Sequence, residues 1–369
     1  MRRRLIAPAI VLLTVSLVGC GKAQQASDKV TQPKDDLSSD NLNNPSDSDA
    51  GQLKAADACK SGKKISGHPV QIVTTVAPLT NLIGLMVAGT NIQVSGIVPE
   101  GTNSHTFEPP PSAASVVEKA DIVFVNGLGL EDPTLDLAKA NAKSAVICEI
   151  GTAVLPKGGW LFDDSFPIAA GKPNPHLWTS PFQVLNYLNV IRDALVVADP
   201  ADMSKFDDNY VKISGVAMQL DQAIKTDTDT VPKSNRKLLT YHDAYAYFAE
   251  RYGYTIVGAI QPQSFEEPSP KDIAKIIDQV KKEHVVAIFG SEVFPSPVLE
   301  QIGKDTGARY VDTLRDDDLL GKPGDADHSW AALMRSNYIT LVKALGGDAT
   351  ALTAVKTNIG ITDKAYYPQ

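Results

Sequence analysis

"ADMSKFDDNYVKISGVAMQLDQAIKTDTDT", residues 201–230, is the stretch that sets the architecture of this 369-residue chain. Apolar residues recur along it at steps of three and four, at Met203, Phe206, Tyr210, Ile213, Ala217, Leu220 and Ile224. Such spacing predicts one helix with a single buried face. About 28 helical residues at 1.5 Å each span roughly 40 Å, comparable to the diameter of a domain. We therefore expect residues 199–230 to form a long, rigid connecting helix.

Four short apolar runs lie on each side of this helix. The first set covers residues 70–76, 92–98, 121–127 and 144–150, and the second covers 236–241, 254–260, 285–289 and 308–312. Helical patterns separate the runs within each set. Buried strands that alternate with helices are typical of parallel sheets with helices on both faces. The sequence therefore predicts an α/β fold with two similar lobes, residues 65–198 and 231–369. Each lobe has a mainly parallel four-stranded sheet covered by helices, and the long helix bridges the two.

The first 64 residues predict export and tethering. Three arginines precede an apolar stretch that is shorter than a membrane span needs, which indicates an export signal over residues 1–19. The ending "LVGC" resembles the lipobox of bacterial lipoproteins, which implies that Cys20 carries lipid and holds the protein on the outer side of the cell membrane. An uncleaved signal anchor is the alternative. Residues 20–64 are nearly free of large apolar side chains and are expected to be a disordered tether.

The net charge bears on possible partners, and the cysteine content bears on disulfide formation. The formal net charge is −8, and no basic block occurs, which argues against a nucleic-acid partner. Besides Cys20, only Cys59 and Cys148 remain. Two leftover cysteines in an exported protein favour a disulfide, and two unpaired thiols are the alternative.

Histidines and an acid stand where the predicted strands end. His105, in "NSHTFEPPP", follows the second run, and His176, in "NPHLWTSP", follows the fourth. In the second lobe, His242 ends the first run and Asp312 ends the fourth. Open α/β sheets bind ligands at the carboxyl ends of their strands, so these four side chains are expected to meet in one cleft. Three imidazoles and a carboxylate suit Zn²⁺, with Mn²⁺ as the second candidate.

Several neighbouring residues have two interpretations. Glu108 and Asp243 are close enough in sequence to accept a hydrogen bond from an imidazole, or they are a surface charge and a helix cap. For the acidic run after Asp312, residues 315–319, one interpretation is that it attracts cations to the mouth of the cleft, and the expected one is a solvated loop. Alternative ligands in the second lobe are Asp325, Asp327 and His328.

The chain resembles a known family, the zinc/manganese substrate-binding lipoproteins of ABC transporters (cluster A-I, solute-binding protein family 9). The matching stretches run in the family's order from residue 70 to about 345, and include "PEGTNSHTFEPPPS", "ADIVFVNGLGLE", "NPHLWTSP", "YHDAYAYFAERYG" and "GARYVDTL". The resemblance implies two α/β lobes bridged by a rigid helix, and metal ligands at His105, His176, His242 and Asp312. It also implies an ABC permease and its ATPase as partners of a monomeric receptor.

Two departures from the family bear on the metal. Many zinc-type members carry a histidine-rich loop before the second ligand, and here that loop, "GGWLFDDSFPIAAGKPNP", contains no histidine. Manganese-type members often have a glutamate where this chain has His242. A third nitrogen ligand favours zinc.

The sequence-based conclusion is a receptor that captures Zn²⁺ or Mn²⁺ between two lobes and delivers it to a permease. No enzymatic activity is expected, because four protein ligands leave no open position for water. A surface adhesin with incidental metal binding is the first alternative. An exported zinc hydrolase with Glu108 or Asp243 as base is the second, although no HExxH pairing occurs.

Overall fold

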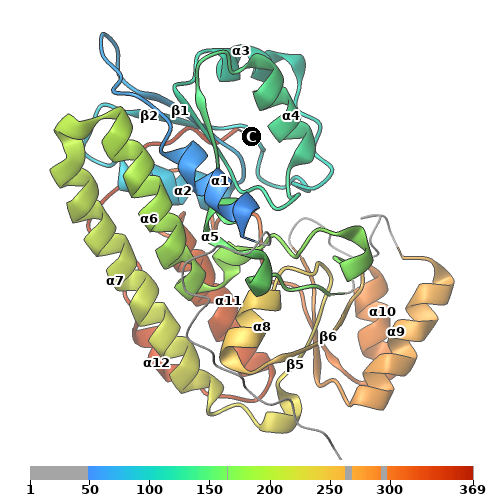
Figure 1. Ribbon diagram of the computed structural model, residues 1–369. Helices are drawn as coiled ribbons and strands as arrows, with labels where there is room; N and C mark the ends of the chain where they lie inside the picture. Colours follow the sequence, from blue (N-terminus) through green and yellow to red (C-terminus); the bar gives the residue numbers. More distant parts are fainter. Residues whose placement is uncertain (1–48, 164, 262–267, 292–296, 369) are drawn as a thin grey trace, which may run out of the picture. The chain divides into compact units, whose positions relative to one another are not determined.

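A computed structural model describes residues 49–163, 165–261, 268–291 and 297–368. The export signal, Cys20 and most of the expected tether lie outside these residues. The helices and strands alternate along the chain through both halves of the described part (Figure 1). Their bounds are α1 Ala50–Cys59, β1 Gln71–Thr74, α2 Ala77–Met86, β2 Gln93–Gly96, α3 Pro111–Glu118, β3 Ile122–Val125, α4 Asp132–Asn141, β4 Val146–Glu149, α5 Ile150–Val154, α6 Pro181–Ala198, α7 Met203–Thr228, β5 Lys237–Thr240, α8 Ala246–Tyr252, β6 Thr255–Ala259, α9 Pro270–Glu283, β7 Ala287–Phe289, α10 Pro297–Thr306, β8 Arg309–Val311, α11 Trp330–Ala344 and α12 Thr350–Ala354.

Two four-stranded sheets form the lobes, and every strand lies inside one of the eight apolar runs. The strand orders are β2-β1-β3-β4 and β6-β5-β7-β8, and all pairs are parallel. The same order in both sheets makes the lobes topologically alike. The predicted fold class is confirmed.

Alternate strand residues pack against different helices, which explains why the runs are apolar throughout. Val73 and Val123 pack with α3 and α4, which lie together beside the sheet in Figure 1. Their neighbours Ile72 and Ile122 point to the other face and join the core that contains α2 and α6. Both faces of the sheet are therefore buried, as the continuous apolar pattern requires.

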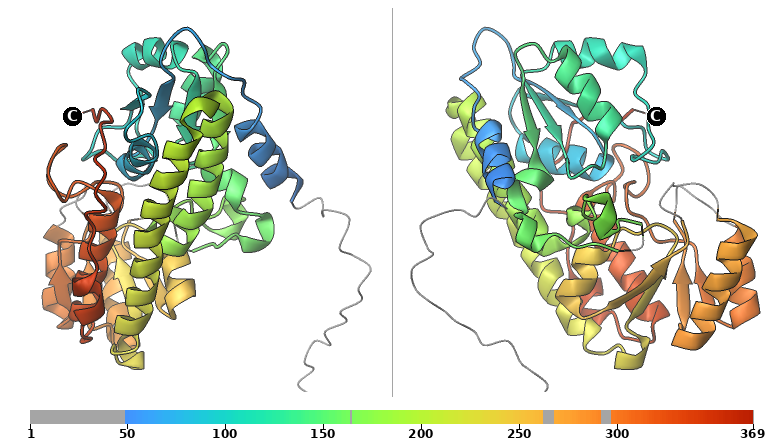
Figure 2. Two further views of the ribbon diagram at one scale, coloured as in Figure 1. Left: turned by 90° about the vertical axis from the view of Figure 1, so that its left-hand side faces the viewer. Right: turned by 45° about the vertical axis from the view of Figure 1, so that its right-hand side comes forward.

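The long connecting helix is α7, and it packs antiparallel to α6 (Figure 2). It contacts α2 of the first lobe and α8, α11 and α12 of the second. Of the seven predicted apolar positions, only Met203, at the first residue of the helix, is exposed. One apolar core extends from both sheets to the buried face of α7, so the helix joins the lobes through packing as well as through the chain. No helix in the described part of the chain has the length and apolar character to cross a membrane.

Two parts of the chain depart from the predicted domain bounds. Residues 50–59 were expected in the disordered tether, but they form α1, which packs against α5 and β4. At the other end, the segment after α12 returns to the first lobe, where the Tyr366 N–H donates to the Val94 carbonyl and the Gly96 N–H donates to the Tyr366 carbonyl. The described segment around Tyr366 therefore pairs with the edge strand β2 and does not stay with the second lobe.

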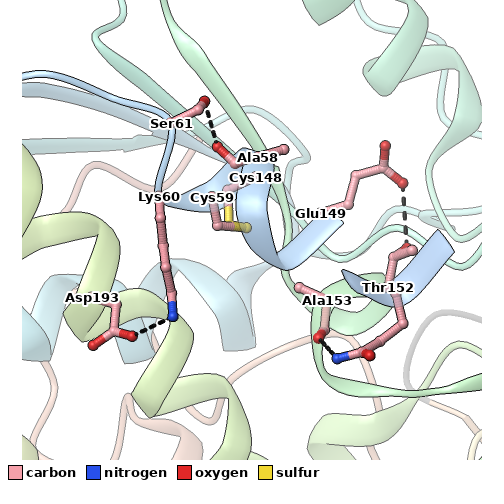
Figure 3. Close-up of a disulfide and its surroundings, with 10 residues drawn as sticks. Ala58, Cys59, Lys60, Ser61, Cys148, Glu149, Thr152, Ala153 and Asp193 are labelled. Carbon is pink, nitrogen blue, oxygen red and sulfur yellow. Dashed lines mark hydrogen bonds and ion pairs between the residues drawn. A yellow bond between two sulfur atoms is a disulfide. The ribbon is translucent and has the colours of Figure 1, made fainter. Parts of the chain in front are cut away.

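A disulfide joins Cys59 to Cys148 (Figure 3). It links the last residue of α1 to β4, and both sulfur-bearing residues are buried. Beside it, Lys60 pairs with Asp193 of α6 at 2.9 Å. These links hold the start of the described chain on the first lobe.

Candidate metal centre

Three histidines from three separate segments converge through their Nε2 atoms. His105 lies in the loop between β2 and α3, His176 precedes the turn that begins α6, and His242 follows β5. His176 Nε2 is 3.2 Å from His105 Nε2 and 2.9 Å from His242 Nε2. The strand-end rule therefore places all three imidazoles in one cluster.

Amide side chains set the tautomers of two of these rings. Nδ1 of His176 is 2.9 Å from Asn174 Oδ1, and Nδ1 of His242 is 2.9 Å from Gln261 Oε1. Since an amide oxygen only accepts, Nδ1 of each ring carries the proton, and each Nε2 is left with a lone pair. Asn174 is held in this orientation because its Nδ2 donates to Asp163 and to the Asp243 carbonyl.

Two Nε2 lone pairs at 2.9 Å repel each other unless positive charge lies between them. The pair formed by His176 and His242 is therefore arranged to bind a cation. In a tetrahedral zinc site with Zn–N bonds of 2.0–2.1 Å, ligand atoms are roughly 3.3 Å apart. The observed Nε2 separations lie close to that value.

The carboxylate of the cluster comes from Asp316. Its Oδ2 lies 3.6 Å from His242 Nε2, and its Oδ1 accepts from the Ser291 hydroxyl. Asp316 is 5% exposed, and with Asp317 it also lies within ligand range of His176. The donor set is then three imidazole nitrogens and one carboxylate, with a second carboxylate adjacent.

Asp312 does not join the histidines, which corrects the predicted fourth ligand. It is the first residue after β8, and its side chain is exposed. The chain then turns inward, with Leu314 buried, and reaches the imidazoles four residues later at Asp316. The expected solvated loop at 315–319 is also wrong, because Asp316, Asp317 and Asp318 are all buried.

Glu108 and Asp243 were candidate acceptors for the imidazoles. Glu108 is exposed and lines a surface hollow with residues of α4, because the prolines that follow lead the chain outward to α3. Asp243 is fully buried, and its carboxylate accepts from the Ser165 N–H. Through its carbonyl it holds Asn174, so it acts on His176 indirectly. The direct acceptors, Asn174 and Gln261, were missed, because neutral amides carry no sequence pattern that marks them.

The alternative ligands in the second lobe lie elsewhere. His328 is buried, and its Nδ1 donates to the Leu320 carbonyl while its ring contacts Tyr367 edge to face. Asp325 and Asp327 are exposed. Among the described residues, none of the three belongs to a group that could hold a metal ion.

Aromatic side chains shield the cluster from water. The Phe166 ring lies 5.4 Å from that of His105 and 5.7 Å from that of His176, and Trp178 contacts His176 at 5.1 Å. Phe166 belongs to the segment that replaces a histidine-rich loop, so this segment covers the imidazoles here.

Burial has an electrostatic consequence for the two histidines nearest Phe166. Burial, and to a smaller extent the neighbouring His242, lowers the pKa of His105. Burial followed by the other two rings lowers the pKa of His176. Both imidazoles are therefore neutral at neutral pH and available to coordinate a metal ion.

The "NG" turn after β3 supports His176 from behind. Asn126 Nδ2 donates to the carbonyl of Pro175, and the Tyr187 hydroxyl donates to Asn126 Oδ1. The turn itself is held by Glu131, which accepts from the Asn126 N–H at 2.6 Å. Burial raises the pKa of Glu131 to about 7, although the hydrogen bonds that it accepts oppose the shift. This motif therefore positions a candidate ligand and is not part of the imidazole cluster.

Comparisons with known proteins show what the chain is similar to. A family model described as "Zinc-uptake complex component A periplasmic" matches residues 72–344. The chain is 28% identical over 285 residues to the manganese-binding lipoprotein MntA of Halalkalibacterium halodurans, covering 77% of this chain and 91% of that protein. It is 25% identical over 279 residues to the iron-binding protein YfeA of Yersinia pestis, covering 75% of this chain and 86% of that protein. The structure of the periplasmic zinc-binding protein TroA from Treponema pallidum superposes with a TM-score of 0.67 at 18% identity, covering 75% of this chain and 99% of that one.

Proposed function

Because the chain belongs to the family of periplasmic zinc-uptake complex components A, we propose that it captures a divalent transition metal ion outside the cytoplasm for an ABC importer. One observation carries the proposal: the Nε2 atoms of buried imidazoles face one another beside Asp316, an arrangement that suits a bound cation. The ligands are His105, His176, His242 and Asp316. Its curated relatives include manganese- and iron-binding proteins, which fits a receptor for transition metals.

We propose Zn²⁺ as the cargo, with Mn²⁺ as the second candidate. Three nitrogen ligands and one oxygen ligand in a shielded, closed set suit zinc. Manganese prefers more oxygen ligands, and Asp317, next to Asp316, offers one. The two ions therefore differ in whether Asp317 takes part.

Delivery requires partners in the membrane. The proposed partners are a permease and its ATPase, and docking on the permease shifts the second lobe, which carries His242 and Asp316, away from His105 and His176. The receptor acts as a monomer and is held at the outer face of the cell membrane by lipid on Cys20. Replacing Cys20 with alanine should move the protein from the membrane fraction to the soluble fraction. Retention in the membrane would contradict the lipid anchor.

The experiment that tests the proposal is a competitive titration of the metal-stripped protein with Zn²⁺ and Mn²⁺ by calorimetry. The protein should begin at residue 49 or earlier, so that α1 and the disulfide are kept. Tight 1:1 zinc binding with weaker manganese binding is expected. Binding of neither ion would remove the proposed function.

Two other functions give different results. If the protein is an adhesin with incidental metal binding, deleting it will reduce cell attachment and leave uptake of radiolabelled metal unchanged. A zinc hydrolase needs a base beside the metal. The exposure of Glu108 and the hydrogen bond that the Asp243 carboxylate accepts from the Ser165 N–H support neither residue in that role. We expect uptake to fall in the deletion strain.

A further inference from the structure

Two carboxylates that follow Asp316 in the chain connect the lobes next to the metal centre. Asp317 and Asp318 follow Asp316 in the acidic loop, residues 315–319 of the second lobe, and each is only 7% exposed. Both reach the His105 loop, residues 100–105 of the first lobe. Ser104 Oγ donates to Asp317 Oδ2 at 2.6 Å, and the Gly101 N–H lies 2.8 Å from both oxygens of Asp318.

A further hydrogen bond runs in the opposite direction between the same two loops. The Leu319 N–H donates to Glu100 Oε1 at 3.0 Å. Each loop therefore supplies both donors and acceptors to the other. Charged acceptors in a buried setting form the stronger class of hydrogen bond, so this contact contributes more than an exposed ion pair would.

The other end of the acidic loop is fixed to its own lobe. The Arg315 N–H donates to Asn337 Oδ1 of α11, and Asn337 Nδ2 donates back to the Arg315 carbonyl. The first lobe also reaches this end, because Trp178 Nε1 donates to the Asp316 carbonyl at 2.9 Å. Asp316 is therefore fixed from both sides. Hydrogen bonds hold the backbone of Arg315 and Asp316 on one side, and hydrogen bonds from the first lobe hold the carboxylates of the next two residues on the other.

We propose that Asp318 and the Ser104 hydroxyl are positioning groups for the metal. They hold the acidic loop on the His105 loop and so fix the carboxylates of Asp316 and Asp317 against His105. The inference rests on the proposed function, since it gives these residues a part in retaining the captured ion. His105 and Asp316 are direct neighbours in sequence of Ser104 and Asp317. If the acidic loop separates from the His105 loop, the distance between Asp316 and His105 therefore increases.

The arrangement couples metal binding to the contact between the loops. Three consecutive buried carboxylates repel one another, and a divalent cation on Asp316 offsets that repulsion. Metal therefore favours the docked loop, and by linkage the docked loop favours metal. Release requires the hydrogen bonds to Ser104 and Gly101 to break together with the metal–ligand bonds, so their loss should act mainly on the rate of dissociation.

The test measures metal dissociation from the full-length chain in detergent, loaded with Zn²⁺ and mixed with excess chelator in a stopped-flow instrument. The variants are Asp318→Ala, Ser104→Ala and the conservative Ser104→Thr, which keeps the hydroxyl. Asp327→Ala is the matched control, because it removes one exposed aspartate from the same lobe. The melting temperature of each metal-free variant is measured in parallel.

We expect Asp318→Ala and Ser104→Ala to dissociate zinc about 10- to 100-fold faster than wild type, the range for losing one hydrogen bond to a charged group. Association rates should change less than about threefold, and Ser104→Thr and Asp327→Ala should behave as wild type. The inference is overturned if Ser104→Ala and Asp318→Ala release zinc at rates within about twofold of the rate of the control Asp327→Ala. If Asp318→Ala does not fold, the comparison of Ser104→Ala with Ser104→Thr decides alone. Tight binding by wild type with unchanged variants removes only this inference, whereas no binding by wild type removes the proposed function and the inference together.

Discussion

The hydrogen bond on one nitrogen of an imidazole decides what the other nitrogen can do. Gln261 Oε1 accepts the proton of His242 Nδ1, so the lone pair of that ring is on Nε2, the nitrogen that faces the cluster. The same holds for Asn174 and His176. Such acceptors fix ring orientation and raise ligand basicity, and their loss in metal proteins costs 10- to 100-fold in affinity.

Gln261→Leu should therefore weaken zinc binding by about 10- to 100-fold, whereas Gln261→Glu, which keeps an acceptor at the same atom, should retain most of the affinity. Calorimetric titration with a competing chelator measures both. Equal losses in the two variants would show that the amide acts through packing and not through the imidazole proton.

The fourth ligand can be assigned by replacing single aspartates with alanine. Asp316→Ala should reduce zinc affinity by about 100-fold or more, because structural zinc sites gain roughly 10–16 kcal/mol from about four ligands. Asp312→Ala removes an exposed carboxylate beyond the end of β8 and should leave the affinity unchanged. A large loss in Asp312→Ala with little in Asp316→Ala would return the ligand to the position that the sequence suggested.

Burial of the histidines should also appear in the pH dependence of the metal-free protein. The folded-state pKa of His105 and of His176 is lowered, mainly by burial, while an unfolded chain has the ordinary value near 6.5. Below about pH 6.5 the unfolded state therefore binds more protons than the folded state, and the free energy of unfolding falls as the pH drops. The slope should approach at most about 1.4 kcal/mol per pH unit for each ring.

Denaturant unfolding at several pH values between about 7.5 and 5 measures this slope. His105→Ala combined with His176→Ala should flatten the curve below pH 6.5. A curve that is equally steep in the double variant would assign the pH dependence to other groups.

At the level of elements, strands and the long helix are set by local patterns, which is why the sequence predicted them well. Each of the eight strands lies inside its apolar run, and α7 buries the face that the three-and-four spacing marks. The path of a loop is different, because it depends on contacts with distant residues. Asp316 reaches the imidazoles since Leu314 is buried and Asn337 holds the backbone of Arg315, and neither contact is visible in the loop's own sequence.

The helix α1 illustrates the same limit. Residues 50–59 contain few large apolar side chains and were expected to be part of the tether. What holds them are partners distant in sequence: Cys59 bonds to Cys148, and Gln52 Nε2 donates to the Ala153 carbonyl at 2.6 Å. Composition favoured disorder because it does not record such partners.

Removing this disulfide should lower stability and leave the metal centre intact. The bond closes a loop with a sequence separation of 89, and losing it should reduce the free energy of unfolding by about 2–4 kcal/mol. None of the four proposed ligands belongs to α1 or β4, so zinc affinity should stay within about threefold of wild type. Cys59→Ala with Cys148→Ala, measured by denaturant unfolding and by titration, tests both statements. A large loss of affinity would mean that α1 supports the site.

At the level of the whole described molecule, the lobes share a core but contribute different ligands. The apolar cluster around α7 contains residues of both sheets, which favours a small tilt over a wide opening. The metal adds a second connection, because His105 and His176 lie before α7 in the chain and His242 and Asp316 lie after it.

Metal should therefore stabilise both lobes together. An ion that binds only the folded state at about 1,000 times its dissociation constant adds roughly 4 kcal/mol, which corresponds to a rise in melting temperature on the order of 10 °C for a chain of this size. Calorimetric scans of the metal-free and zinc-loaded protein should show one transition that moves upward as a whole. Asp316→Ala should abolish the shift and Asp312→Ala should keep it. If zinc moves only part of the transition, the ion is held by the ligands of one lobe, and its capture does not join the two.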